Sequence, residues 1–160
     1  MSGDVIGKDI DFPRKTSIII ESPGFLPNYS ALQNLMILAD ISGVSSREQI
    51  RHSILQVGLD PNDKKPVRQY SMGMRQRLGI AQAIMDDPDI LLLDEPYNGL
   101  DKKAMRDISR IFQNLKEQGK LIILISHYAH EIQENCDKIY EMEDGGIHPC
   151  KKYFEDTAVG

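Results

Sequence analysis

The chain has 160 residues, with 19 Lys and Arg against 24 Asp and Glu, which gives a formal net charge of −5. The length is typical of one globular domain, and a hydrophobic content of 41% excludes a generally disordered chain. The acidic balance argues against a protein that mainly neutralises nucleic-acid phosphates, so we expect no nucleic-acid partner.

The sequence also favours a cytoplasmic location. The apolar runs, such as residues 121–125, are far shorter than the roughly 20 residues that cross a bilayer. The first residues lack the basic-then-apolar pattern of a secretory signal. Cys136 and Cys150 form no CxxC pair, and so few cysteines fit a reducing compartment.

Short apolar runs alternate along the chain with amphipathic stretches, which predicts strands alternating with helices. In chain order, the predicted elements are a strand at 17–20, helices at 31–41 and 46–57, a loop at 58–68, a helix at 71–85, a strand at 90–93, a helix from Asp101 to Gln118, a strand at 121–125, a helix around 128–135, and a hairpin with a strand at 138–143 and a turn at Gly145-Gly146. The uniformly apolar strands predict an α/β fold in which helices cover both faces of a mostly parallel sheet.

Ligands collect beyond the carboxyl ends of the strands in sheets of this kind. Polar residues follow all three apolar runs: Glu21 after the first, Asp94-Glu95 after the second, and Ser126-His127 after the third. Asp94 at a strand end could bind Mg²⁺ together with substrate phosphates, and Glu95 could polarise a water molecule. An acidic turn or helix cap is the simpler alternative for this pair.

Two further segments could bind phosphate. Ser71 and Gly73 lie at the start of a predicted helix, where free backbone N–H groups favour an anion, although an ordinary N-cap and turn explain them equally well. Asn98-Gly99-Leu100-Asp101 is most simply a turn with an N-cap. His127 alone would more often be a core or turn residue than a catalytic one.

The segments YSMGMRQRL, ILLLDEP, NGLD and ISH, in this order and spacing, resemble the nucleotide-binding domain of ATP-binding cassette (ABC) transporters. The resemblance extends roughly over residues 17–147. It implies a P-loop NTPase core of the ABC-ATPase type, with a mostly parallel sheet and a helical signature subdomain. It also implies ATP and Mg²⁺ as cofactors.

The resemblance suggests roles for individual residues. Asp94 matches the Walker B aspartate that holds Mg²⁺, and Glu21 falls where most members carry the Q-loop glutamine, from which it could still coordinate Mg²⁺ or water. Glu95 matches the catalytic glutamate that polarises the attacking water. His127 matches the switch histidine that senses the γ-phosphate.

Other matches concern the junction between two ATPase subunits. Ser71 and Gly73 match the signature loop, which in this family closes over ATP bound to the opposite subunit, and Asp101 matches the D-loop aspartate. The resemblance therefore implies a homo- or hetero-dimer with another ABC ATPase subunit. It also implies a membrane-spanning permease that holds the protein on the inner face of the cell membrane.

Two segments of the sequence resemble those of ABC transporters that export peptides, antibiotics or lantibiotics. Tyr70, Met72 and Met74 replace residues of the commonest signature, LSGGQ, and the resulting YSxGMxQRLGIA together with IIIESPGFLPN is similar to that branch. Residues 25–29 (FLPNY) follow the Q-loop, which in the family contacts the permease. A packed surface loop is the alternative for this segment.

The sequence contains no P-loop, GxxxxGK(S/T), whose N–H groups and Lys bind the phosphates of ATP. Gly7-Lys8 is followed by Asp9, and Gly119-Lys120 by Leu121, so neither pair qualifies. We therefore expect residues 1–160 to form one partial domain that lacks the P-loop strand and the N-terminal β-subdomain. Within it, residues 22–85 would form the Q-loop and helical part, 86–148 the Walker B, D-loop and switch-histidine core, and 149–160 a tail.

Four interpretations follow. The first is an ATP-binding subunit whose ATPase activity is uncertain because the Walker A lysine is missing. The second is a non-hydrolytic module that supplies the signature loop to an intact subunit, and the third a degenerate gene product. The fourth, an ABC-type ATPase of DNA repair or translation, is disfavoured by the absence of heptads, zinc hooks and a basic arm. A zinc site at His127, His130 and Cys136 is also disfavoured, because the family already accounts for His127.

Overall fold

The computed structural model describes residues 15–20, 24–43 and 45–150. Glu21 lies outside the described residues. The chain divides into two compact units, residues 1–125 and residues 126–160. Among the described residues, no helix is long and apolar enough to cross a membrane.

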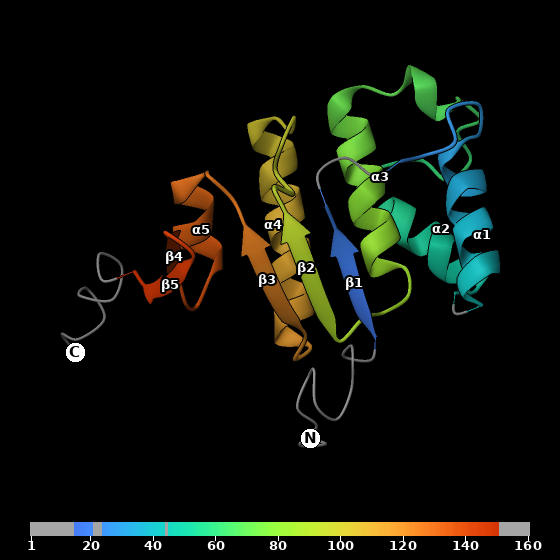
Figure 1. The fold of residues 1–160 in the computed structure, drawn as a ribbon. Helices are drawn as coiled ribbons and strands as arrows, with labels where there is room; N and C mark the ends of the chain where they lie inside the picture. The colour runs from blue at the N-terminus through green and yellow to red at the C-terminus, as the bar shows by residue number, and fades with distance from the viewer. Residues whose placement is uncertain (1–14, 21–23, 44, 151–160) are drawn as a thin grey trace. The chain divides into compact units, whose positions relative to one another are not determined.

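The elements follow the predicted order closely. The first unit contains β1 (Thr16–Ile19), α1 (Ala31–Ser42), α2 (Arg47–Gln56), the 3₁₀ turn η1 (Val67–Gln69), α3 (Met72–Ile84), β2 (Ile90–Asp94), α4 (Lys102–Glu117) and β3 (Leu121–Ile125) (Figure 1). The second contains α5 (Ala129–Asn135) and an antiparallel hairpin of β4 (Tyr140–Glu143) and β5 (Gly146–Pro149). The predicted hairpin is therefore confirmed.

Polar side chains fix where the helices begin. Ser30 and Ser46 form capping boxes with Gln33 and Gln49 at the starts of α1 and α2. Ser71 and Asp101 cap α3 and α4, each by accepting a bond from a backbone N–H of the first turn. The same residue types that indicated helix starts in the sequence therefore satisfy the otherwise unpaired N–H groups in the structure.

The three strands of the first unit form a parallel sheet in the order β1-β2-β3. Ile19 lies opposite Leu93, and Asp94 lies opposite Ile125, so the carboxyl ends of the strands meet at one edge. This alignment brings the residues that follow β2 close to the end of β3. The parallel α/β fold is as predicted.

The two faces of this sheet differ strongly, which corrects the expectation that helices cover both. On one face, Ile19, Leu91 and Leu93 are at most 3% exposed. α3 contacts β1 and α4 contacts β3, and Figure 1 shows α4 behind β2 and β3. On the opposite face, five aliphatic side chains are between 42% and 70% exposed: Ile18, Ile20, Leu121, Ile123 and Ile125. We call these five residues the open face.

Chain topology explains this one-sided cover. The chain passes from β1 to β2 to β3 in a single direction across the sheet. Crossovers between parallel strands are right-handed, so connections that advance in one direction place their helices on the same face. Helices on the open face would require connections running in the opposite direction. The described part of residues 1–125 has none.

Candidate functional site

The exit of β2 carries Asp94, which the sequence predicted to bind Mg²⁺, and Glu95, which it predicted to be catalytic. Asp94 is the last residue of β2 and is half-buried. Glu95 follows with φ 48°, in the left-handed region that non-glycine residues rarely occupy. Its backbone N–H donates to the carbonyl of Ile125 at 2.8 Å, and the Oε2 atom of its carboxylate is buried. The two carboxylates thus lie on adjacent residues at the end of one strand.

The backbone carbonyl of Glu95 accepts two hydrogen bonds. The N–H of Asn98 donates to it at 3.1 Å, which closes the turn after β2. The side-chain amide of Gln76, on α3, donates to it at 3.2 Å. Tyr97, whose side chain is fully buried, anchors the same turn because its hydroxyl lies 3.1 Å from the Oγ of Ser109 on α4. The turn is therefore fixed to both helices that cover the sheet.

The start of α3 packs against this turn. The Oγ of Ser71 accepts from the N–H of Met74 at 3.2 Å, and Ser71 is exposed. A Cβ added to Gly73 would lie 2.8 Å from the carbonyl oxygen of Gly99, so only glycine permits this backbone approach. Gly99 has φ 72°, and a Cβ there would meet the Met72 side chain at 2.6 Å. The structure thus brings the predicted signature residues next to the predicted D-loop.

Asp101 ends that turn at the start of α4. Its carboxylate accepts a hydrogen bond from the N–H of Ala104 at 2.8 Å. This hydrogen bond is the main reason why the pKa of Asp101 lies below its usual value, and the Arg77 guanidinium contributes in the same direction. Asp101 is therefore ionised near neutral pH and acts locally as a helix cap.

His127 belongs to the second unit. It is exposed, and its ring lies 4.3 Å, centroid to centroid, from the ring of Tyr128. Tyr128 is the N-cap position of α5, and its N–H donates to the Oγ of Ser126 at 3.1 Å. These contacts orient His127 locally within its own unit.

The donor groups present fit part of a Mg²⁺–ATP site. Mg²⁺ is commonly held by one or two carboxylates together with substrate phosphates and water. Asp94 and Glu95 supply such carboxylates, and no cluster of three His, Cys, Asp or Glu suited to a metal occurs in the described ranges. The phosphate cradle is different, because no GxxxxGK(S/T) segment exists among the 160 residues. These residues therefore fit the metal and signature sides of such a site but not its P-loop side.

Gln76 is the residue of this neighbourhood to which the sequence assigned no role. It is only 5% exposed. It lies four residues before the buried Ile80 and seven before the buried Ala83, on the core face of α3. An amide on an apolar helix face needs a buried hydrogen-bond partner. A glutamine on the apolar face of a predicted helix was therefore the sequence signal that could have identified Gln76.

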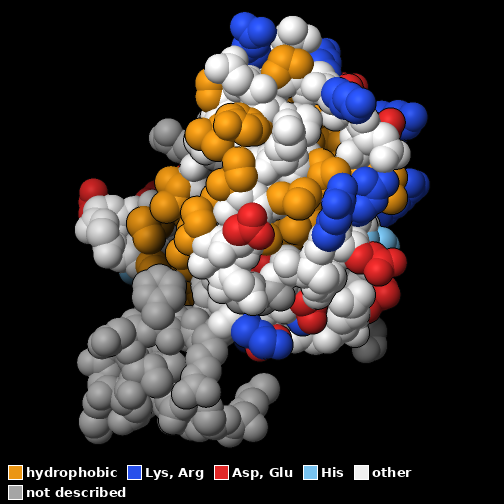
Figure 2. Space-filling model, turned by 90° about the vertical axis from the view of Figure 1, so that its right-hand side faces the viewer, with side chains coloured by type: hydrophobic (Ala, Val, Ile, Leu, Met, Phe, Trp, Pro, Cys, Tyr) orange, Lys and Arg blue, Asp and Glu red, His pale blue; other side chains and the backbone are white. Residues whose placement is uncertain are grey.

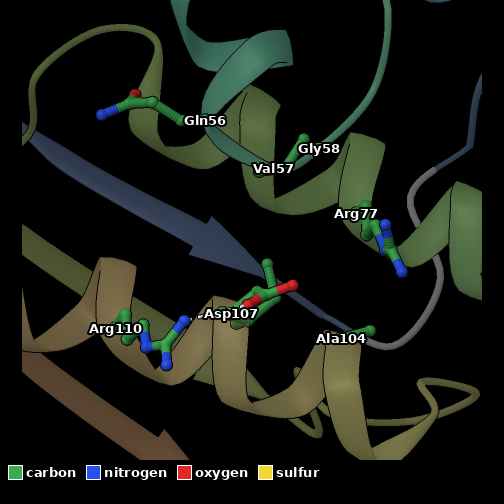
Figure 3. A pocket seen from close by; sticks show the side chains of 8 residues that line it. Gln56, Val57, Gly58, Arg77, Ala104, Asp107 and Arg110 are labelled. Carbon is green, nitrogen blue, oxygen red and sulfur yellow. Dashed lines mark hydrogen bonds and ion pairs between the residues drawn. The ribbon is translucent and has the colours of Figure 1, made fainter.

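A cavity of about 260 Å³ lies between the end of α2, α3 and α4 (Figure 3). Its charged lining consists of Arg77, Asp107 and Arg110, and the last two form an ion pair at 3.4 Å. None of the predicted site residues lines this cavity.

The loop before α1 is held rigidly by Asn34. The side chain of Asn34 is buried; it accepts from the N–H of Leu26 at 2.7 Å and donates to the carbonyls of Leu26, Tyr29 and Ser30 at 3.0–3.2 Å. The N–H of Val67 also donates to the Tyr29 carbonyl at 2.9 Å. Residues 26–30 thus form an ordered surface segment.

Basic side chains gather near this segment. Residues 45–77 contain seven Lys and Arg against three Asp and Glu, in a chain whose overall charge is negative. Figure 2 views the molecule from the side of α1 and α2 and shows Lys and Arg side chains beside exposed hydrophobic ones. This side therefore offers both apolar and cationic contacts.

Comparison with known proteins agrees with the motifs. The chain matches the sequence profile of the ABC transporter family (ABC_tran) over residues 3–98. It is 41% identical over 159 residues to the uncharacterized ABC transporter ATP-binding protein YybJ of Bacillus subtilis (strain 168), which covers 98% of this chain and 73% of that protein. It is 42% identical over 134 residues to the bacitracin transport ATP-binding protein BcrA of Enterococcus faecalis, covering 83% and 44%.

A third relative is the lantibiotic transport ATP-binding protein SrtF of Streptococcus pyogenes, which is 39% identical over 140 residues, covering 88% of this chain and 61% of SrtF. Among solved structures, a dimeric post-hydrolysis state of the ATP-binding cassette MJ0796, bound to ADP and Pi, matches with a TM-score of 0.73 and 21% identity. That match covers 84% of this chain and 62% of the other, and it shows a common fold. The matches thus span 44–73% of these three relatives.

Proposed function

The chain belongs to the ABC transporter family, and from this premise we propose that it acts as the ATP-binding subunit of an exporter. In this proposal, ATP binding and hydrolysis drive transport through a membrane-spanning permease, with the protein peripheral on the cytoplasmic face of the membrane. The names of BcrA and SrtF favour peptide antibiotics or lantibiotics as the exported class.

One observation supports the ATPase part of this proposal above the others. The β2 exit, the start of α3 and the turn before α4 are in direct contact, through the Gln76–Glu95 hydrogen bond and the approach of Gly73 to Gly99. Residues far apart in sequence thus lie close together, which supports a shared role in handling phosphate. A set of unrelated turns and caps would not need this proximity.

The proposed roles follow the chemistry of each group. Asp94 binds Mg²⁺, with Glu21 as a second oxygen ligand, and Glu95 polarises the attacking water. The free N–H groups in the first turn of α3, beside Ser71 and Gly73, bind the γ-phosphate of ATP held by a second ATPase subunit. Asp101 lies at the junction of these two subunits.

For His127, in the second unit, we propose a role in sensing the γ-phosphate. For the permease contact we propose the ordered loop before α1, where Leu26 and Tyr29 are each 44% exposed. Their apolar surface, together with the basic residues nearby, suits a docking segment of mixed apolar and acidic character.

The missing P-loop makes a sharp test possible. We expect the purified chain alone to bind ATP weakly and to show negligible Mg²⁺-dependent hydrolysis, because nothing in it replaces the P-loop lysine. Adding a polypeptide that carries a P-loop should restore turnover, and Glu95→Gln in this chain should abolish the restored activity. Robust turnover by the chain alone, lost on Glu95→Gln, would contradict the first expectation.

The second candidate function is a non-hydrolytic module that lends its signature loop to an intact subunit. The exposure of Ser71 and Met72 at the start of α3 favours it, since an opposite subunit could reach them. In this case, Glu95→Gln would leave the stimulated ATPase activity unchanged, whereas Ser71→Ala would reduce it. No stimulation at any mixing ratio would leave only the degenerate gene product.

A further inference from the structure

Gln76 is one of four buried polar residues in the described chain, and it is 5% exposed. Its amide lies between α3 and the β2 exit, where Nε2 donates to the Glu95 carbonyl at 3.2 Å. A buried amide that lost this acceptor would remain desolvated without a partner, which is unfavourable. The hydrogen bond is therefore a strong constraint on both elements.

The main chain at Glu95 needs such a constraint. Its φ of 48° is unfavourable for a residue with a Cβ, and the conformation persists only where surrounding contacts impose it. Three contacts do so here: the Glu95 N–H donates to Ile125, and the Glu95 carbonyl accepts from Asn98 and Gln76. Two come from β3 and the turn, and only the third comes from α3.

The same helix contacts the other end of the turn. Gly73, three residues before Gln76, faces the carbonyl of Gly99 closely enough that a Cβ would lie 2.8 Å from it. α3 therefore touches the turn at Glu95 and again at Gly99. A displacement of α3 along the turn would break the hydrogen bond or cause a clash between the two backbones.

We propose that Gln76 is a positioning residue: it holds the Glu95 main chain in its left-handed conformation, and so sets the direction in which the Glu95 carboxylate leaves the strand. Through this bond the signature helix and the catalytic carboxylate of one subunit move as one body. That the positioned carboxylate is catalytic rests on the proposed function. The hydrogen bond and its effect on the Glu95 main chain do not depend on that function.

The sequence allows Glu95 to be observed selectively. Glu95-Pro96 is the sole Glu-Pro pair in the chain, so labelling with carbonyl-¹³C glutamate and ¹⁵N proline gives one carbon–nitrogen coupled carbonyl signal. Gln76→Met removes the amide but keeps a similar size. Gln82→Met is the matched control, because Gln82 lies on the same helix, is half-buried, and its side chain makes no hydrogen bond in the described structure.

We expect Gln76→Met to move the Glu95 carbonyl signal upfield, as loss of a hydrogen bond does, by more than Gln82→Met moves it. The ¹³Cα and ¹³Cβ chemical shifts of Glu95, which report its main-chain conformation and are assigned with Glu95→Gln, should also change in Gln76→Met and stay unchanged in the control. If Gln76→Met does not fold, Gln76→Asn retains the amide but is one methylene too short, and the same two shifts are expected.

An unchanged carbonyl signal would overturn the hydrogen bond. A changed carbonyl signal with unchanged Cα and Cβ chemical shifts of Glu95 would overturn the positioning role. Neither measurement requires nucleotide turnover. A failure of the proposed ATPase function would therefore appear separately, as absent hydrolysis in every mixture, while the two NMR results would still decide on Gln76.

Discussion

The two faces of the sheet have nearly the same amino-acid composition but very different surroundings. Leu91 and Leu93 on one face are covered by α3 and α4, whereas Ile123 and Ile125 on the other belong to the open face. Aliphatic side chains are therefore placed by strand alternation alone, and the direction of the crossovers decides which of them are buried. An apolar run therefore indicates a strand, and the chain topology decides which face of that strand is covered by helices.

The largest expected effect contrasts one residue from each face. Leu93→Ala should lower the free energy of unfolding by about 2–5 kcal/mol, because it creates a cavity under the covering helices. Ile123→Ala, on the open face, should cost less than about 1 kcal/mol, since its side chain already contacts water. Urea denaturation of both variants measures this, and equal losses would contradict the one-sided core.

The next prediction concerns the glycines on either side of α4, the helix that covers β2 and β3. Gly99 and Gly119 both have positive φ, but a Cβ meets Met72 at Gly99 and open space at Gly119. Gly119→Ala should cost about 1–2 kcal/mol from backbone strain alone. Gly99→Ala should cost about 1–3 kcal/mol more, because Met72 must also move. Thermal unfolding of the pair compares them, and similar losses would mean that Met72 adapts freely.

A smaller effect is expected where the edge strand β3 begins. Lys120 Nζ lies 2.9 Å from Asp87 and 3.5 Å from Asp89, which precede β2, so it ties the start of β3 to its neighbour. Because the Asp carboxylates are largely exposed, Lys120→Met should cost only about 1 kcal/mol.

The pH dependence of this pair has a definite sign. The hydrogen bond to Asp87 raises the pKa of Lys120 above the usual lysine value of about 10.4. The stabilisation is therefore fully present below that value and is lost as the pH rises through the higher folded-state pKa. The stability difference between the wild type and Lys120→Met should shrink in strongly alkaline buffer. A difference that grows there would contradict this assignment.

The smallest stability change is expected from making the open face polar. Ile123→Thr retains β-branching and should change the free energy of unfolding by no more than about 0.5–1 kcal/mol. It should nevertheless reduce self-association, because exposed apolar patches and open strand edges promote it. Analytical ultracentrifugation of wild type and variant tests this, with the exposed Leu55→Thr on α2 as a control outside the sheet. Equal self-association of the wild type and both variants would show that the chain does not associate through the open face.

Local patterns in the sequence predicted most of the fold. Helical periodicity, the caps at Ser71 and Asp101, and the apolar strand runs depend on neighbouring residues alone, and they placed each element within a few residues. The cover of the sheet could not be predicted in the same way. The run at residues 121–125 reads identically whether one face or both are buried, because burial depends on elements far away in the chain.

The candidate site was predicted to a similar extent. Motif order identified Asp94, Glu95, Ser71, Gly73, Asp101 and His127, and the structure places the first five in the first unit. Their roles remain proposals, as does the domain division. The φ of Glu95 and its link to Gln76 were not predictable, because they arise where a strand exit, a turn and a separate helix meet.

Asn34 has a consequence for molecular recognition. The buried Asn34 side chain donates three hydrogen bonds and accepts one, and these fix residues 26–30, although this segment has no regular secondary structure. Its Leu26 amide proton should therefore exchange with solvent as slowly as a helical one. A partner that binds Leu26 and Tyr29 would meet a surface already in its final shape, and little conformational entropy would be lost on association.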